Sequence, residues 1–157
     1  MADNVDAGTR SRMMSAIRGK DTKPEVTIRR YLHSKGFRFR LHRPDLPGKP
    51  DLVLAKYRLA IFVHGCFWHR HEGCFYATSP ATRSDFWQTK LSANVERDGR
   101  QVVLLQAAGW RVMIIWECGL KLSLHQVDEI DRLIRSDLVI MEWPPCPPRL
   151  RSPAQSL

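Results

Sequence analysis

The first regular pattern of apolar residues along the chain is helical. Ile28, Tyr31 and Leu32 recur at i, i+3 and i+4, the spacing of one face of an α-helix. Residues 21–25, Asp-Thr-Lys-Pro-Glu, provide a capping side chain, a proline suited to the first turn and an acid near the positive end of the helix dipole. Gly36 ends the pattern. The sequence therefore predicts a helix between these two signals.

Strand-like patterns follow this helix. Residues 37–41 alternate apolar and basic side chains with period two, as a half-exposed strand does. After a loop rich in Pro and Gly at residues 43–50, short apolar runs at 52–55 and 59–63 flank a turn at 56–57. The pattern predicts three strands, the last two forming a hairpin.

The second half of the chain predicts a helix, a buried strand and a final helix. Residues 84–107 are typical of a helix in one or two pieces, and Gly109 stops it. Residues 110–116 are apolar nearly throughout, as in a central strand covered on both faces. Residues 124–134 are amphipathic. This order of elements indicates an α/β fold, a mixed β-sheet flanked by helices.

The length of the chain allows one domain with a sizeable core. At 157 residues it falls within the usual single-domain range. We expect a basic N-terminal arm at residues 1–20, a folded domain at residues 21–141 and a Pro-rich, disordered tail at residues 142–157.

The net positive charge of the chain indicates what kind of molecule it binds. The net charge is +9 and the pI about 9.9. Residues 1–50 hold 12 Lys/Arg against 5 Asp/Glu, so +7 of this charge lies there. A basic face of this kind suits nucleic acid. The alternative is a soluble protein that is basic without a polyanionic partner.

Two absences suggest a compartment. No apolar run approaches the roughly 20 residues that span a bilayer, and the N-terminus lacks the basic-then-apolar pattern of a signal peptide. We therefore expect a cytosolic protein without a membrane partner. Because disulfides are rare in the cytosol, the four cysteines are expected to be thiols or metal ligands.

A cluster of metal-binding residue types lies at residues 66–74. Cys66, His71 and Cys74 supply three ligands within nine residues, and Cys118 follows the strand that ends at residue 116. Three cysteines and one histidine can form a closed, structural zinc site. The alternative is ordinary buried thiols beside a surface histidine. Cys146, in the tail, is expected to be free.

Residues suited to phosphodiester chemistry lie at the ends of the predicted hairpin. Asp51 opens one strand, and the partner strand ends at Val63 and His64, so these residues should be close in space. A carboxylate and a main-chain carbonyl there could hold Mg²⁺, which prefers oxygen ligands and can activate water. His64 and His69 could act as base and acid near neutral pH. The alternatives are a strand-capping aspartate and histidines that bind zinc or face solvent.

Aromatic pairs accompany these polar residues. Phe67 and Trp68 lie inside the ligand-rich loop, so at least one should project outward as a wedge between DNA bases. Phe86 is expected to pack in the core. Met13, Met14 and Ile17, on the basic arm, could insert from the other groove.

Together these motifs resemble one family, the very short patch repair (Vsr) DNA mismatch endonucleases of bacteria. The resemblance runs in order over residues 9–120. Its motifs are Thr-Arg-Ser-x-x-Met (9–14), Asp-Thr-x-Pro-Glu (21–25), Leu-Pro-Gly-x-Pro-Asp (46–51), Ile-Phe-x-His-Gly-Cys-Phe-Trp-His (61–69), Pro-Ala-Thr-Arg-x-x-Phe-Trp (80–87), Asn-Val-Glu-Arg-Asp (94–98) and Gly-Trp-Arg-Val…Trp-Glu-Cys (109–118).

The resemblance implies a restriction-endonuclease-like fold with a structural zinc and a Mg²⁺-dependent reaction. The reaction it implies is a nick on the 5′ side of the thymine in a T:G mismatch, which forms when 5-methylcytosine deaminates. Asp51 matches the position that binds Mg²⁺ together with the carbonyl at position 63, here Val63. In the same resemblance, His69 matches the general base, His64 matches a residue beside the scissile phosphate, and Glu25 matches a residue that orients metal-bound water.

The resemblance also assigns DNA-binding and zinc-binding positions. The residues that enter the base stack match Phe67, Trp68 and Trp87 from the major groove and Met14 from the minor groove. Lys90 and Asn94 match base contacts. The zinc ligands match Cys66, His71, Cys74 and Cys118. The loop has one residue more before Cys74 than the family pattern, so His69 and His71 both compete as the zinc histidine, and His71 is favoured.

Two other functions remain open from the residues alone. A zinc-stabilised protein could bind mismatched DNA without cutting it, and a restriction endonuclease on the same fold could cut both strands of paired DNA. The combination of Asp51, His69 and Glu25 favours an enzyme over a binding protein. The aromatic wedge favours a distorted target, because unstacking a mismatch costs less than unstacking a good pair. We expect a monomer at the bacterial nucleoid that meets other mismatch-repair proteins.

Overall fold

The structure, a computed structural model, describes residues 21–152. Its helices are α2 (Lys23–Ser34), α3 (Ser84–Ala107), α4 (Glu117–Leu122) and α5 (Asp128–Arg135), with 3₁₀ turns η1 (Ala55–Tyr57) and η2 (Leu124–Gln126). Its strands are β1 (Arg40–Leu41), β2 (Leu52–Leu54), β3 (Leu59–His64), β4 (Arg111–Trp116) and β5 (Ile140–Trp143). No helix within the described residues is long and apolar enough to cross a membrane.

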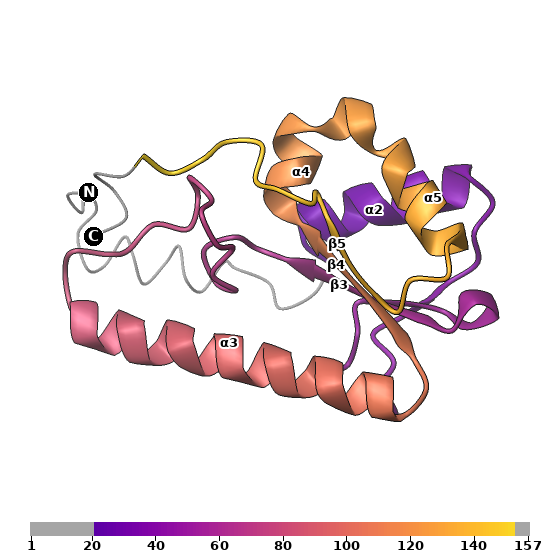
Figure 1. Ribbon diagram of the computed structural model, residues 1–157, viewed down its shortest axis with the longest axis horizontal. Coiled ribbons are helices and arrows are strands. Elements are labelled where there is room, and N and C mark those ends of the chain that lie inside the picture. Colours follow the sequence, from indigo (N-terminus) through magenta and orange to yellow (C-terminus); the bar gives the residue numbers. More distant parts are fainter. Residues whose placement is uncertain (1–20, 153–157) are drawn as a thin grey trace.

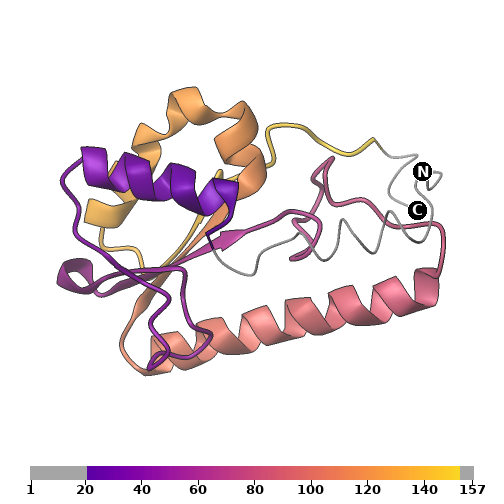
Figure 2. The same cartoon turned by 180° about the vertical axis from the view of Figure 1, so that it is seen from behind.

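The strands form one mixed sheet in the order β1-β2-β3-β4-β5. The pairs β1–β2 and β2–β3 are antiparallel, whereas β3–β4 and β4–β5 are parallel. Helices α2, α4 and α5 cover one face of this sheet and the long helix α3 runs across the other (Figures 1 and 2). The predicted class, a mixed sheet flanked by helices, is therefore confirmed.

The two faces of the sheet bury two separate cores because strand side chains alternate. Ile61, Met113 and Ile115 face the core under α2, α4 and α5. Phe62 and Ile114 point the other way and share their core with Leu105 of α3 and with Cys66, Cys74 and Cys118. The central strands β3 and β4 are thus apolar on both faces, as the sequence predicted for β4.

Helix α2 begins where the capping signals predicted. Thr22 is the N-cap, and its hydroxyl accepts a hydrogen bond from the Glu25 amide at 3.3 Å. The buried side of the helix carries Ile28 and Leu32, both without solvent exposure. The start of α2 therefore fixes Glu25 at one end of the sheet.

Several boundaries differ from those predicted. Strand β1 contains only Arg40–Leu41 of the predicted 37–41 run, residues 84–107 form one helix, and residues 124–134 divide between η2 and α5. Helix α4 was not predicted. It begins directly after β4. Gly119 lets this helix pack closely against Pro144, since a Cβ on Gly119 would lie 2.5 Å from Cδ of Pro144.

The tail was expected to lack structure beyond residue 141, and this is wrong for its first part. Strand β5 runs to Trp143, which is fully buried, and pairs with β4. Residues 149–151 then hydrogen-bond to residues 73–75. These contacts join residues far apart in the chain, so local composition could not reveal them. The division into arm, domain and tail stays a prediction.

Candidate active site and metal centre

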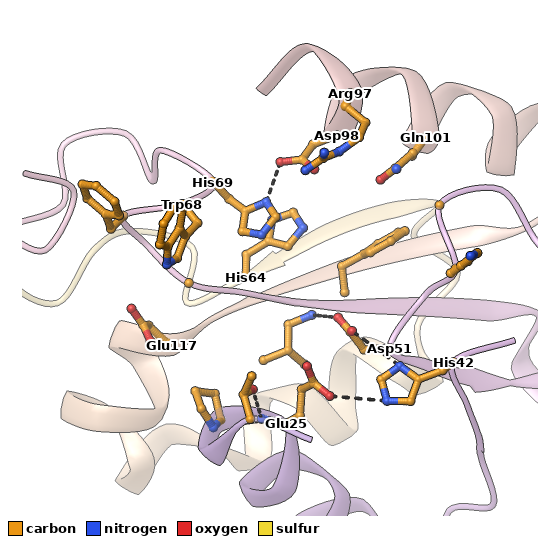
Figure 3. Close-up of a pocket in the computed structure, with 18 of the residues that line it drawn as sticks. Glu25, His42, Asp51, His64, Trp68, His69, Arg97, Asp98, Gln101 and Glu117 are labelled. Atoms are coloured by element: carbon orange, nitrogen blue, oxygen red, sulfur yellow. Dashed lines mark hydrogen bonds and ion pairs between the residues drawn. The ribbon is translucent and has the colours of Figure 1, made fainter. Parts of the chain in front are cut away.

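An open cavity lies at the end of β3, between the N-terminus of α2 and helix α3 (Figure 3). Its volume is about 1370 Å³. Side chains from both halves of the chain line it, among them Glu25, Asp51, His64, Trp68, His69 and Asp98. The structure therefore brings together the acid, histidine and aromatic residues that the sequence singled out.

Asp51 is held against the end of β3. Its Oδ2 accepts a hydrogen bond from the Val63 amide at 2.7 Å, so the predicted proximity of these two residues is confirmed. Burial raises the pKa of the Asp51 carboxyl to about 6, against the opposing effect of that hydrogen bond, and the nearby Glu25 carboxyl adds to the rise. A positive ion beside Asp51 would relieve this cost of burying its charge.

Glu25 is buried and lines the same cavity as Asp51. Its Oε2 accepts a hydrogen bond from Arg29 at 3.0 Å, and His42 Nε2 lies 3.6 Å from the same oxygen. Asp21, Glu25 and His42 each place a ligand atom within 4.8 Å of the others. No motif in the sequence singled out His42, which comes from the loop between β1 and β2.

His64 and His69 form a stacked pair beside α3. Their ring centroids are 3.7 Å apart and the rings are nearly parallel at 4°. His64 is buried, and burial together with the neighbouring His69 lowers its pKa to about 3. His64 is therefore neutral near pH 7 and cannot donate a proton as an imidazolium there.

Asp98 was missed as a site residue by sequence reasoning. Its Oδ2 lies 2.7 Å from Nδ1 of His69, across 29 positions of the chain. A carboxylate accepts hydrogen bonds, so Nδ1–H of His69 donates and Nε2 is left as an acceptor. Asp98 stands in the Asn-Val-Glu-Arg-Asp motif at residues 94–98, which was the only local signal for it.

The second cluster consists of the four residues predicted as metal ligands, Cys66, His71, Cys74 and Cys118. All four are buried, and their ligand atoms lie within 4.8 Å of one another. Nδ1 of His71 lies 3.6 Å from Sγ of Cys66 and 3.4 Å from Sγ of Cys118. Contact with Cys118 and burial raise the pKa of the Cys66 thiol. This cluster could hold a metal ion, which would stabilise the thiolates.

The structure separates the two competing histidines. His71 points to the cysteines, whereas His69 points to Asp98 on α3. The His71 ring also stacks on Trp116 at 4.1 Å, and the Trp116 ring meets His64 edge-on at 5.2 Å. Trp116 therefore joins the metal cluster to the histidine pair.

The aromatic residues of the loop and of α3 form one group. Phe67 and Trp68 are partly exposed, and their ring centroids lie 5.6 and 5.9 Å from that of Trp87. Trp87 is buried beneath them, whereas Phe86 is 45% exposed. The expectation that Phe86 packs in the core is wrong, because α3 turns Trp87 inward at that position.

Lys90 and Asn94 lie on α3 next to this group. The Lys90 ammonium lies 5.9 Å from the Trp68 ring centroid. Nδ2 of Asn94 donates to the Trp68 carbonyl at 3.1 Å. Met14 and Ile17 lie outside the described residues.

The sequence is similar to proteins of one known family. The family model "DNA mismatch endonuclease Vsr" matches residues 2–75. The DNA mismatch endonuclease Vsr of Escherichia coli (strain K12) is 49% identical over 129 residues, which cover 82% of each chain. The chain belongs to the Vsr family of DNA mismatch endonucleases.

Other relatives of this Vsr family member are nicking enzymes. The type II nicking enzyme V.XorIIP of Xanthomonas oryzae pv. oryzae is 49% identical over 120 residues, 76% of this chain and 88% of its own. V.NmeAIP of Neisseria meningitidis is 40% identical over 135 residues, 86% and 96% of the two chains. The protein is a Vsr-type nicking endonuclease, so DNA is its substrate and a divalent metal is implied.

Proposed function

We propose that this endonuclease nicks DNA on the 5′ side of the thymine in a T:G mismatch left by deamination of 5-methylcytosine, with Mg²⁺ as its catalytic ion. The observation that carries the proposal is the cavity at the end of β3, where Asp51, the histidine pair and the aromatic group meet. A protein that binds mismatches without cutting would not need Asp51 or the histidine pair. A restriction enzyme that acts on well-stacked base pairs would not need the aromatic wedge of Phe67 and Trp68.

The donors around Asp51 suit a magnesium ion. Asp51, the main-chain carbonyl of Val63 and Glu25 provide oxygen atoms on one cavity wall, and hard cations prefer oxygen. When bound, Mg²⁺ would supply charge to stabilise the phosphate and activate water. Glu25 would orient that water, since its carboxylate is fixed by Arg29.

The histidine pair would then handle the proton. His69 is the general base: Asp98 holds its Nδ1–H, so Nε2 can take a proton from the attacking water. His64 supports this ring by stacking and faces the scissile phosphate in its neutral form. Asp98 is a positioning residue that acts through His69.

The Cys/His cluster is proposed to hold structural Zn²⁺. Three buried thiols and one imidazole match a closed zinc site, and no ligand position is left for water. Such an ion would tie the loop that begins at Gly65 to Cys118 of α4. The sheet with this site and cavity at one end is proposed to be of the restriction-endonuclease-like type.

The aromatic group is proposed to read the distortion of a mismatch. Phe67 and Trp68 enter the base stack from the major groove, with Trp87 behind them. Lys90 and Asn94 contact bases from α3, while Met14 and Ile17 act from the minor groove. We place the enzyme, as a monomer, in the bacterial cytoplasm at the nucleoid, where it would meet other mismatch-repair proteins.

The experiment is nicking of an end-labelled duplex with one T:G mismatch in a CTWGG-type context, beside its fully paired control, with Mg²⁺ or EDTA. We expect a Mg²⁺-dependent cut in the thymine strand alone, 5′ of that thymine. Binding without a cut, or equal cutting of the paired duplex, would contradict the proposal.

A further inference from the structure

The last described residues lie against the metal-binding loop. We call residues 148–152 the C-terminal strap. Leu150 forms an antiparallel bridge with Cys74. The Phe75 amide donates to the Arg149 carbonyl, and the Arg151 amide donates to the Gly73 carbonyl, both at 2.9 Å. The strap is thus paired by its backbone, in the way an added strand pairs with a sheet edge.

The side chains of the strap add positive charge to this loop. The Arg149 guanidinium lies 3.5 Å from the Phe75 ring centroid. Burial of Arg70 lowers its pKa, and the positive charge of the nearby Arg151 lowers that pKa further. On the neighbouring helix α4, Lys121 lies 4.7 Å from the Tyr76 ring centroid.

None of these cations is neutralised within residues 21–152. The ion pairs of that part of the chain include neither Arg70 nor either arginine of the strap. Gathering like charges without a carboxylate from residues 21–152 costs free energy. An external polyanion would offset that cost.

The position of this charge relates it to the aromatic wedge. Arg70 donates from Nη1 to the Phe67 carbonyl at 3.5 Å, and its guanidinium lies 5.9 Å from the Phe67 ring centroid. The strap pairs with the same loop at Gly73 and Phe75. Alternate residues of an extended segment project to the same side. Arg149 and Arg151 therefore place two positive charges on one side of the strap, next to the loop that carries Phe67 and Trp68.

We propose that Arg149 and Arg151 of the C-terminal strap bind backbone phosphates of the DNA that flanks the site met by Phe67 and Trp68. The strap lies beyond the residues that match the family model. Its two arginines would extend the DNA-binding surface beyond Phe67 and Trp68. The inference rests on DNA as the substrate and not on the T:G or Mg²⁺ assignments.

The test is the salt dependence of DNA binding by full-length Arg149→Gln/Arg151→Gln without added Mg²⁺ or chelator, on a fully paired and a T:G duplex. Each lost phosphate contact should reduce the slope of log K against log salt by roughly 0.9. The loss should be equal on the two duplexes, because phosphate contacts carry no sequence information. The charge-matched control is Lys56→Gln/Arg132→Gln, which alters exposed residues of η1 and α5 and should leave the slope unchanged.

A slope equal to that of the wild type, in a variant that retains its metal, would overturn the proposal. A charge-preserving variant, Arg149→Lys/Arg151→Lys, covers the case in which the Gln variant loses metal or unfolds. It should keep the wild-type slope, and a reduced slope in the metal-loaded Lys variant would mean that the arginines act through packing on Phe75. Wild-type nicking of the T:G duplex is measured separately, so failure of the strap proposal leaves the proposed function standing.

Discussion

At the scale of single residues, the site depends on a few side chains held in one orientation each. Asp51 is fixed by the Val63 amide, and His69 by Asp98. The first contact joins neighbouring strands of a hairpin, whereas the second joins a loop to a helix. Substitutions at Asp51 and at Asp98 are therefore expected to have different effects.

Replacing Asp51 by Asn should abolish nicking while DNA binding remains. Asn keeps the shape of Asp51 but removes the negative charge proposed to hold Mg²⁺. We expect nicking to fall by at least about 1000-fold, within the range that metal and acid–base groups contribute. Single-turnover nicking and a binding titration in EDTA measure the two properties. A loss of binding equal to the loss of nicking would identify Asp51 as a structural residue.

Replacing Asp98 by Asn should slow nicking through His69. The amide can donate to Nδ1 and so place the histidine proton on Nε2, where it blocks base catalysis. We expect a decrease on the order of 100-fold, the lower end for a general base. If Asp98 acts only through His69, the double variant with His69→Ala should be no slower than His69→Ala alone.

The control for Asp98 is Glu96→Gln, an exposed carboxyl on the same helix with 74% of its side chain accessible. It should nick at the wild-type rate. An additive double variant would show that Asp98 has a role of its own, separate from His69.

At the scale of elements, the packing of α4 on β5 decides how the sheet ends. Gly119 of α4 approaches Trp143 and Pro144 so closely that an added Cβ would lie 2.7 Å from Cζ3 of Trp143. Neither element was predicted from the sequence, because each is short and depends on the other for burial. A substitution that adds one methyl group at Gly119 tests this contact.

Replacing Gly119 by Ala should destabilise the fold by about 1–3 kcal/mol, the usual cost of overpacking. The matched change is Gly99→Ala in α3, where an added Cβ meets nothing within 4 Å. Because Ala is the better helix former, that change should stabilise by up to about 1 kcal/mol. Chemical denaturation measures both free energies of unfolding, and equal effects would rule out the close packing at Gly119.

At the scale of the whole molecule, the metal cluster connects distant parts of the chain. Cys66, His71 and Cys74 belong to the loop after β3, while Cys118 belongs to α4 after β4. The cysteines also form part of the core under α3. Metal binding should therefore affect the stability of the fold and not only that of the loop.

Replacing Cys118 by Ser should release the metal and lower the free energy of unfolding by at least about 3 kcal/mol. For a chain of this size the melting temperature should fall by roughly 6–12 °C. Cys146→Ser is the control, because that thiol is exposed and free. Thermal melting and metal content check the result, and His69→Ala should keep its metal whereas His71→Ala should not.

Much of this architecture could be predicted from local sequence. The signals at Thr22 and Gly36 bounded α2 to within two residues, because caps and glycine stops act over one turn. The proximity of Asp51 to Val63 followed from a short hairpin turn. The set Cys66, His71 and Cys74 lies in one loop, so residue type and spacing alone marked it as a candidate metal site.

Contacts between distant residues could not be predicted in this way. The pairing of β5 with β4, the strap on the metal loop, Asp98 beside His69 and the stack of His71, Trp116 and His64 all join separate elements. Hydrogen bonding and burial at those positions depend on which distant segments of the chain pack next to them in the folded structure. The sequence by itself determined which residue types and local elements are present, because these follow from short-range caps, periodicity and ligand spacing. Only the tertiary structure decided which histidine faces the three cysteines and which faces the cavity at the end of β3, since that depends on how α3 and α4 pack against the sheet.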